Sequence, residues 1–304
     1  MLRTFRLCDA RIEECPAEGA SIHFYINPTE DEKRYLVDVL KIDEHTLASA
    51  LDPDELARLE FEPEHAALIF KRPKNYSAKD LFLFRVTSTG YFLFKDKLVC
   101  LLSEDIPLFE GKIFARTSSH HEALLKMLYR TIFHFLEHLK IINRISDELE
   151  QKINRAMENR YLLNLFTLEK SLVYYLNAIH SNAMAIEKIK HSAAKIGLAP
   201  EAVEFLDDLI VENNQCLKQA EIYANILTGL MDARGTIVGN NINVLMKTLN
   251  IITIGIMVPT FVVSAFSMNV KIPLARIPFA FWIIMGLAAV SVVGFLLFWK
   301  FRKW

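Results

Sequence analysis

Two long stretches without a charged residue lie near the C-terminal end of the chain. Residues 248–270 and residues 277–299 each hold 23 consecutive uncharged and mainly apolar positions. A helix rises about 1.5 Å per residue, so each stretch is long enough to cross a hydrocarbon layer about 30 Å thick. Only residues 271–276 separate them. The pattern predicts a hairpin of two membrane-spanning helices joined by a very short outer loop.

The first span and the residues before it carry mostly polar side chains at regular spacing. Positions that are alternately three and four residues apart fall on one face of a helix. The residues of this face, called the polar stripe below, are Asn243, Met246, Asn250, Thr253, Met257, Thr260, Ser264 and Ser267. Such a stripe either ties membrane helices together through hydrogen bonds or lines a water-filled pore. A single hairpin cannot enclose a pore, so the second interpretation requires an oligomer with the first spans innermost.

Residues 1–115 have the pattern of a mixed α/β domain. A strand is predicted at 21–26, and Thr29 and Glu32 then form a capping box that begins a helix. A second short helix is expected at 53–59. Three aliphatic and aromatic runs predict the rest of the sheet at 66–70, at 81–86 and at 91–94 continuing through 98–102, with turn breaks at 73–75 and 89–90.

Residues 116–247 change to a helical period and form the predicted arm and stalk. A long apolar face begins after Ser118, and a second helix is expected at 160–195. Pro200 suits the first position of a third helix. No proline follows until Pro259, so this third helix can run directly into the first span. A helix of about 65 residues reaches on the order of 100 Å and needs partners along its length, which again favours an oligomer.

The charges are divided unevenly along the chain. The net charge is only -1, yet the first 232 residues hold all 36 acidic residues and 28 basic ones, whereas residues 233–304 hold seven basic residues and no acidic one. Basic residues flanking the hairpin, including the tail at 300–304, outnumber the two in its loop. By the positive-inside rule, both termini are expected in the cytoplasm.

The composition also excludes several classes of protein. The four cysteines are scattered without a Cys-x-x-Cys pair, so neither a zinc ribbon nor a disulfide framework is indicated. The N-terminus has no apolar run that would make a secretory signal. We therefore expect reduced thiols in a cytosolic compartment, and not a secreted hydrolase, a nuclease or a toxin.

One short motif suggests zinc chemistry. His134, Glu137 and His138 match the H-x-x-E-H pattern, in which histidines four residues apart share a zinc ion. The motif lies in a long apolar helix, and the sequence identifies no third ligand. We favour a helix that presents these side chains on its polar side. A membrane-tethered enzyme or scaffold is the alternative outside transport.

The end of the first span matches a known family signature. The chain reads Phe266-Ser267-Met268-Asn269 there, with Asn243-x-x-Met246-Lys247-x-Leu249 upstream and Pro259-Thr260 in mid-span. This pattern resembles the CorA family of magnesium transporters, in which an aromatic-Gly-Met-Asn signature ends the first of two C-terminal spans. The resemblance extends over the whole order of the chain, from α/β domain and helical stalk to hairpin and basic tail.

The resemblance implies an α+β membrane protein of the plasma (inner) membrane, assembled as a homopentamer around a central pore. Ser267, Met268 and Asn269 would form the selectivity filter, where the Asn269 oxygens touch a hydrated Mg²⁺ ion. Asn243, Met246, Leu249, Met257 and Thr260 match pore positions of the family, and Asn250, Thr253 and Ser264 complete the expected lining. The implied cargo is Mg²⁺ driven inward by the membrane potential, with no cofactor besides Mg²⁺ and with lipid as the other partner.

The same resemblance implies regulation by cytosolic Mg²⁺. Asp208 and Asp232 fall where family members place acidic residues on the stalk, some of which bind Mg²⁺ between subunits. Asp207 fits the first position as well as Asp208. Occupied sites would hold the pore shut, and depletion of Mg²⁺ would release it.

The sequence also departs from the family pattern. Ser267 replaces the glycine of the signature and Phe266 replaces its usual tyrosine. The outer loop carries Lys271 and Arg276 where the family usually has an acid, and two cations repel Mg²⁺. Some family members carry Zn²⁺, Co²⁺ or Ni²⁺, so a transition-metal transporter is the alternative within transport.

Overall fold

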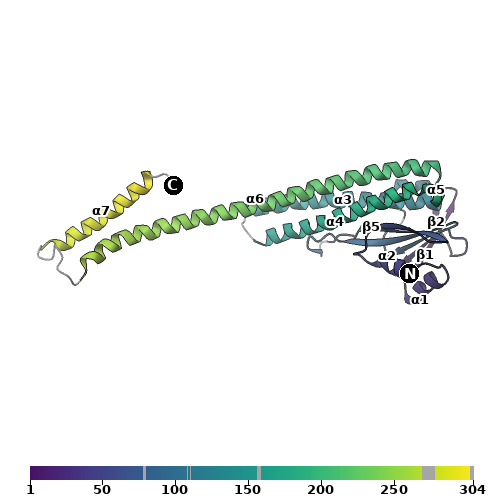
Figure 1. The fold of residues 1–304 in the computed structure, drawn as a ribbon, viewed down its shortest axis with the longest axis horizontal. Helices are drawn as coiled ribbons and strands as arrows, with labels where there is room; N and C mark the ends of the chain where they lie inside the picture. Colours follow the sequence, from purple (N-terminus) through teal and green to yellow (C-terminus); the bar gives the residue numbers. More distant parts are fainter. Residues whose placement is uncertain (78–79, 108, 110, 156–158, 269–277, 302–304) are drawn as a thin grey trace. The chain divides into compact units, whose positions relative to one another are not determined.

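The computed structural model describes residues 1–77, 80–107, 109, 111–155, 159–268 and 278–301. It forms two compact units, Met1–Met231 and Asp232–Trp304. In Figure 1 the first unit is a sheet with short helices on one face and long helices on the other. The second unit consists of the end of one long helix and a further helix after it.

The sheet of the first unit has seven strands in the order β2-β1-β3-β7-β6-β5-β4. The strands β3 and β7 pair in parallel, and the other neighbouring strands pair antiparallel. Their bounds are Leu2–Cys8 for β1, Arg11–Glu14 for β2, Ile22–Ile26 for β3, Arg58–Phe61 for β4, His65–Pro73 for β5, Val86–Phe94 for β6 and Leu98–Leu102 for β7.

Helices cover both faces of this sheet. On one face lie α1 and α2, and on the other lie α3, α4 and the first part of α6. The bounds are Glu30–Asp38 for α1, Glu44–Leu51 for α2, Lys112–Ala115 for the 3₁₀ turn η2, His120–Arg155 for α3, Asn159–His191 for α4, Ala193–Ile196 for α5, Pro200–Phe266 for α6 and Ala280–Phe301 for α7.

The central strands are buried on both sides because their side chains alternate between two cores. In β7, Leu98, Cys100 and Leu102 face the long helices, whereas Val99 and Leu101 face α1 and α2. All five are at most 1% exposed. Burying each large apolar side chain contributes about 1.5–3 kcal/mol. The sequence therefore shows β7 as a continuous apolar run rather than as an alternating one.

Side chains of α4 complete the hydrogen bonding of the sheet where β4 has ended. The Asn182 Oδ1 accepts from the Lys71 N–H at 2.8 Å, and its Nδ2 donates to the Lys71 carbonyl at 2.8 Å. Ser171 Oγ accepts from the Phe84 N–H at 3.0 Å. Both side chains are fully buried. They fix α4 on the sheet, because an unpaired buried backbone group costs about 1–3 kcal/mol.

The first part of α6 packs with a seven-residue repeat. Its buried residues within the first unit are Leu206, Leu209, Asn213, Cys216, Ala220 and Leu227. The amide of Asn213 donates to the Ile179 carbonyl of α4 at 3.1 Å. Spacings of three and four residues keep this face on the neighbouring helices.

Several predicted elements are confirmed. Thr29 and Glu32 form the expected capping box at the start of α1. The strand expected at 21–26 corresponds to β3, and α3 and α4 lie close to the expected helical ranges. The uninterrupted run after Pro200 is a single helix of 67 residues. This α6 contains Pro259 and extends to Phe266, so stalk and first span are one element, as predicted.

The helix predicted at 53–59 is wrong. The helix in this region is α2, which begins earlier because Asp43 caps it by accepting from the Thr46 N–H. It ends before Pro53, since the residue preceding a proline disfavours helical geometry. The carbonyls of Pro53 and Glu55 instead accept from the buried Lys71 Nζ at 2.6 and 2.7 Å.

The strand predicted at 81–86 and the turn predicted at 89–90 are also wrong. Leu81 and Phe82 adopt positive φ of 47° and 68° in a turn, and β6 begins only at Val86. Gly90 lies inside β6 because α2 crosses there. A Cβ on Gly90 would lie 2.6 Å from the Ala50 Cβ, so the glycine permits a close approach rather than a turn.

The hairpin of β1 and β2 was not predicted. Its turn consists of Asp9 and Ala10, which both have positive φ. The strand β1 alternates polar and apolar residues, including the buried Phe5, so a period-two signal was present in the sequence. It was missed because the turn lacks the Asn-Gly or Asp-Gly pair that usually marks such hairpins.

The second unit holds two helices that are long and apolar enough to span a membrane. In the most apolar 18-residue windows of α6 and α7, 0% and 6% of the residues are buried within the structure. A helix that is apolar on most sides and unburied requires an apolar environment of its own. The predicted spans at 248–270 and 277–299 overlap these helices, although residues 269–277 lie outside the described part of the chain.

Candidate ion pathway and regulatory positions

The predicted pore residues lie on α6 or, for Ser267 and Met268, directly after its end, and all are exposed in the single chain where the structure describes them. They are Asn243, Met246, Leu249, Asn250, Thr253, Met257, Thr260, Ser264, Ser267 and Met268. None of them is buried against the described part of the chain, which is consistent with a face that meets water or other subunits.

The hydroxyl groups of the stripe are oriented by the helix itself. Thr253 Oγ1 donates to the Leu249 carbonyl at 2.8 Å, and Thr260 Oγ1 donates to the Ile256 carbonyl at 2.7 Å. Each hydroxyl therefore uses its one proton on the backbone and keeps oxygen lone pairs free to accept. Free acceptor oxygens are what a cation with a hydration shell requires from a pore wall.

One part of the stripe also faces the second helix of its own chain. Asn243, Met246 and Asn250 line a groove of about 450 Å³ between α6 and α7, opposite Phe295 and Trp299. Among the described residues, no side chain of the stripe is hydrogen-bonded to α7. The stripe could instead hold the two helices of one hairpin together through hydrogen bonds. The described part of the chain contains no such contact in support of this interpretation.

The predicted filter lies where α6 ends. Ser267 leaves the helix in a turn, with its N–H and Oγ both donating to the Ser264 carbonyl at 3.1 and 2.9 Å. Met268 follows and is 59% exposed. Asn269, and the loop cations Lys271 and Arg276, lie outside the described residues.

The two aspartates that the sequence predicts to be regulatory, Asp208 and Asp232, differ from the neighbouring Asp207 in their partners. Asp207 forms an ion pair with Lys190 of α4. Asp208 and Asp232 are exposed, and neither takes part in an ion pair among the residues that the structure describes. Asp208 is therefore the more available of the two adjacent carboxylates, a choice that the sequence left open.

The H-x-x-E-H motif is a packing feature of the first unit. The His134 and His138 rings lie 4.4 Å apart, and His138 Nδ1 is 2.7 Å from the Tyr175 hydroxyl of α4. Burial lowers the pKa of both histidines to about 4, so both are neutral at pH 7. His138 is 5% exposed, so it does not lie on a polar face as expected. Within the described residues, no group of three potential metal ligands occurs.

Comparison with known proteins decides the family. The model of the family described as CorA-like Mg²⁺ transporter protein matches residues 22–303. The chain belongs to this family. It is therefore a transporter of the CorA family in a membrane, and not an enzyme, which answers the alternative raised by the H-x-x-E-H motif.

Individual relatives agree with this assignment. The chain is 23% identical over 289 residues to the cobalt/magnesium transport protein CorA of Methanocaldococcus jannaschii, covering 91% of this chain and 89% of the relative. The complete structure of the CorA magnesium transporter from the same organism covers 98% of this chain and 96% of that chain, with a TM-score of 0.82 and 20% identity. The structure of the full-length CmaX protein aligns with this chain with a TM-score of 0.74 and 14% identity. The alignment covers 100% of this chain and 97% of the CmaX chain. At these identities the structures show a shared fold.

Proposed function

We propose that this chain assembles as a homopentamer that conducts Mg²⁺ into the cell, driven by the membrane potential. The pore would be lined by the α6 face that carries the polar stripe and Leu249, and Ser267, Met268 and Asn269 would form the filter at its outer mouth. Both termini would lie in the cytoplasm. The observation that carries the proposal is the exposed stripe, whose threonine oxygens remain free to accept.

Physical chemistry favours a pathway for a hydrated ion. Mg²⁺ gives up its water ligands reluctantly, so neutral acceptors that contact the hydrated ion need not replace its inner shell. Rings of Met246, Leu249 and Met257 in an oligomer would form apolar constrictions between the polar levels. Such constrictions close a pore by excluding water.

The direct test of the filter is Mg²⁺ uptake into proteoliposomes. We expect Asn269→Ala to lower uptake at least about tenfold, because a ring of acceptors for the hydrated ion is lost. The matched control is Asn214→Ala, which removes an exposed amide from the part of α6 in the first unit. Unchanged uptake in Asn269→Ala would remove Asn269 from the filter.

A second cation is favoured by one observation. The relative from Methanocaldococcus jannaschii is named for cobalt as well as magnesium transport. Competition by Co²⁺, Zn²⁺ and Ni²⁺ in the same uptake assay separates the two proposals. Mg²⁺ uptake that persists in excess of these ions supports a magnesium channel, and direct uptake of a transition metal in preference to Mg²⁺ supports the alternative.

We propose regulation through Asp208 and Asp232, each with ligands supplied by a neighbouring subunit. Both carboxylates are exposed, and neither is neutralised by an ion pair among the described residues. Mg²⁺ bound between subunits would hold them together in the closed arrangement. Loss of cytosolic Mg²⁺ would then let mutual repulsion of the carboxylates open the pore.

A further inference from the structure

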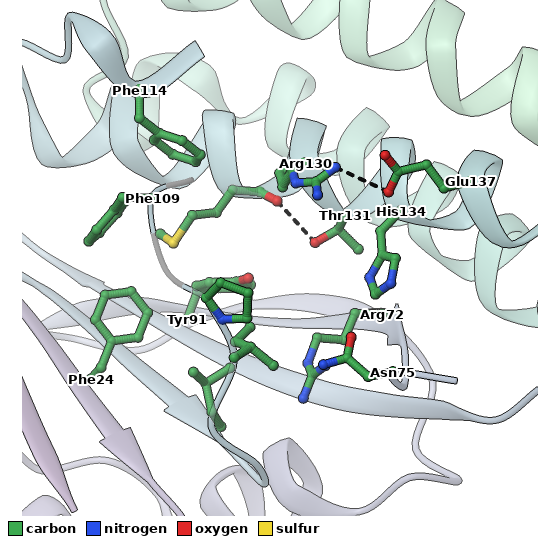
Figure 2. Close-up of a pocket in the computed structure, with 14 residues that line it drawn as sticks. Phe24, Arg72, Asn75, Tyr91, Phe109, Phe114, Arg130, Thr131, His134 and Glu137 are labelled. Atoms are coloured by element: carbon green, nitrogen blue, oxygen red, sulfur yellow. Dashed lines mark hydrogen bonds and ion pairs between the residues drawn. The ribbon is translucent and has the colours of Figure 1, made fainter. Parts of the chain in front are cut away.

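A cavity of about 150 Å³ lies in the first unit between the sheet and α3. Figure 2 shows that its two ends differ in chemistry. At one end Phe24, Phe109 and Phe114 pack edge to face, with ring centroids 5.5 and 5.4 Å apart along the series. At the other end lie Arg72 and Asn75, close to His134.

The Arg72 guanidinium is buried without a full set of partners. The residue is 4% exposed, and its Nε has no hydrogen-bond partner among the described residues. Its Nη1 is 3.4 Å from the Pro73 carbonyl, and its Nη2 is 3.0 Å from Glu104 Oε1 without the alignment of a hydrogen bond. A buried donor left unpaired costs about 1–3 kcal/mol, and more when it is charged. The cavity therefore offers a donor that lacks an acceptor.

The charges at this end leave one positive charge uncompensated. Arg72 and Lys74 both lie near Glu104, at 3.0 and 3.9 Å. Arg130 Nη1 pairs with Glu137 Oε2 at 3.3 Å. Arg72, Arg130 and Glu137 line the cavity, Glu104 pairs with Arg72, and Lys74 is linked to the lining only through Glu104. This set of linked ion pairs holds three positive and two negative groups. A bound monoanion would bring the net charge of these groups to zero, whereas a dianion such as phosphate would leave it negative.

We propose that this cavity binds a small monocarboxylate with an aromatic or short aliphatic body. Its carboxylate would accept from the Arg72 guanidinium and the Asn75 amide, in the fork geometry that arginine offers to carboxylates. Its apolar body would fill the space beside Phe24, Phe114 and Met127. A cavity of about 150 Å³ is known to hold a benzene ring, so a benzoate-sized ligand fits.

The test uses 4-fluorobenzoate as the probe. The full-length chain in a neutral detergent is titrated and followed by ¹⁹F NMR, with 4-fluorobenzyl alcohol as the uncharged match. We expect saturable binding of the carboxylate with a Kd of about 1 mM or below, which is ordinary for so small a ligand. The alcohol is expected to bind at least about tenfold more weakly, since it lacks the charge that pairs with Arg72.

Two pairs of variants assign the binding to the cavity. Arg72→Gln should weaken binding at least about tenfold, and its control Arg34→Gln removes an exposed arginine of α1. Met127→Phe fills the apolar end and should abolish binding, whereas Met184→Phe adds the same bulk on an exposed face. Far-UV circular dichroism verifies that each variant is folded.

Three results overturn the proposal. They are no saturable binding, equal binding of the alcohol and the carboxylate, or an unchanged Kd in Met127→Phe. If Arg72→Gln does not fold, Asn75→Ala replaces it, because Asn75 is the second proposed donor to the carboxylate and is exposed, so its loss is tolerable. An unchanged Kd in that variant together with Met127→Phe likewise rejects the site.

Discussion

At the scale of single residues, two threonines on α6 make the same hydrogen bond but lie on different sides of the helix. Thr260 belongs to the polar stripe and donates to the carbonyl four residues earlier at 2.7 Å. Thr248 makes the equivalent bond at 2.9 Å, away from the stripe. Both are exposed in the single chain. If replacing each threonine changes Mg²⁺ uptake differently, the difference must come from the surroundings of the two sides of α6.

We predict that Thr260→Val lowers Mg²⁺ uptake and that Thr248→Val does not. Valine keeps the shape of threonine and removes the acceptor oxygen. Loss of about 1 kcal/mol of stabilisation along the pathway lowers the rate about fivefold. The measurement is initial uptake by proteoliposomes at equal protein content. Equal losses in both variants would show that the stripe is not distinguished from the rest of α6.

At the scale of elements, α3 and α4 are joined by a buried polar contact that depends on a neutral histidine. His138 of α3 lies against the Tyr175 hydroxyl of α4 and against the His134 ring. Arg130 and Arg72 also act on His134, while Glu137 partly offsets the effect at His138. Burial is the main reason that the pKa of each histidine falls to about 4.

This contact predicts acid sensitivity of the first unit. The pKa of a histidine in the unfolded chain is about 6.5. As the pH falls below that value, the unfolded chain binds a proton at this histidine, whereas the folded chain does not, so the unfolded state is favoured. Stability is therefore fully present above about pH 6.5 and declines until about pH 4. For His138 alone the difference corresponds to about 3 kcal/mol. The free energy of unfolding at each pH is measured by urea unfolding of the full-length chain in neutral detergent, followed by far-UV circular dichroism.

The comparison variant isolates the histidine from other titrating groups. His138→Gln keeps a partner for Tyr175 and cannot take up a proton, so its loss of stability between pH 6.5 and 4 should be smaller. His180→Gln, at an exposed position of α4, should behave as the unmodified chain does. Identical pH dependence in all three proteins would reject the role given to His138.

Periodicity in the sequence predicts elements well where one pattern dominates. The stripe and the absence of proline between Pro200 and Pro259 define α6, and the capping box at Thr29 defines the start of α1. Prediction from the sequence fails where contacts between distant parts of the chain accompany the local conformation. Gly90 is a strand residue paired with β5 and β7, and its lack of a Cβ makes room for Ala50 of α2. Residues 53–55 form a loop in which the carbonyls of Pro53 and Glu55 accept from Lys71.

The candidate site was only partly visible in the sequence. The spacing of the stripe places the predicted pore residues of α6 on one helix face, and the predicted filter comes from the resemblance to the family signature. No local pattern distinguishes Asp208 from Asp207, because the distinction comes from Lys190 on another helix. The cavity beside Arg72 left only a weak signal, namely a charged residue at the end of an apolar strand.

At the scale of the whole molecule, acidic and basic residues are divided between the two parts of the chain. The first 232 residues hold every carboxylate of the chain, and the membrane-spanning part that follows holds none. Carboxylates are the side chains that bind Mg²⁺ most readily. Under the proposed function, sensing of Mg²⁺ would therefore lie before the hairpin, and permeation would depend on neutral oxygens.

We predict that neutralising the two aspartates weakens inhibition by internal Mg²⁺. Asp208→Asn with Asp232→Asn should raise uptake several-fold at millimolar internal Mg²⁺ and change it little when internal Mg²⁺ is absent. Asp207→Asn is the control, since its carboxylate is occupied by Lys190. Uptake that stays equally inhibited in the double variant would exclude these residues as sensors.

In the proposed function the chain itself conducts Mg²⁺ in response to voltage. The most direct measurement is Mg²⁺ entry into liposomes that contain only the purified chain and an internal Mg²⁺ dye, with an inside-negative potassium diffusion potential. A potential of 100 mV acts on a doubly charged ion with about 4.6 kcal/mol, so entry should rise steeply with the imposed potential. Entry at the rate of protein-free liposomes, or entry independent of the potential, would contradict the account.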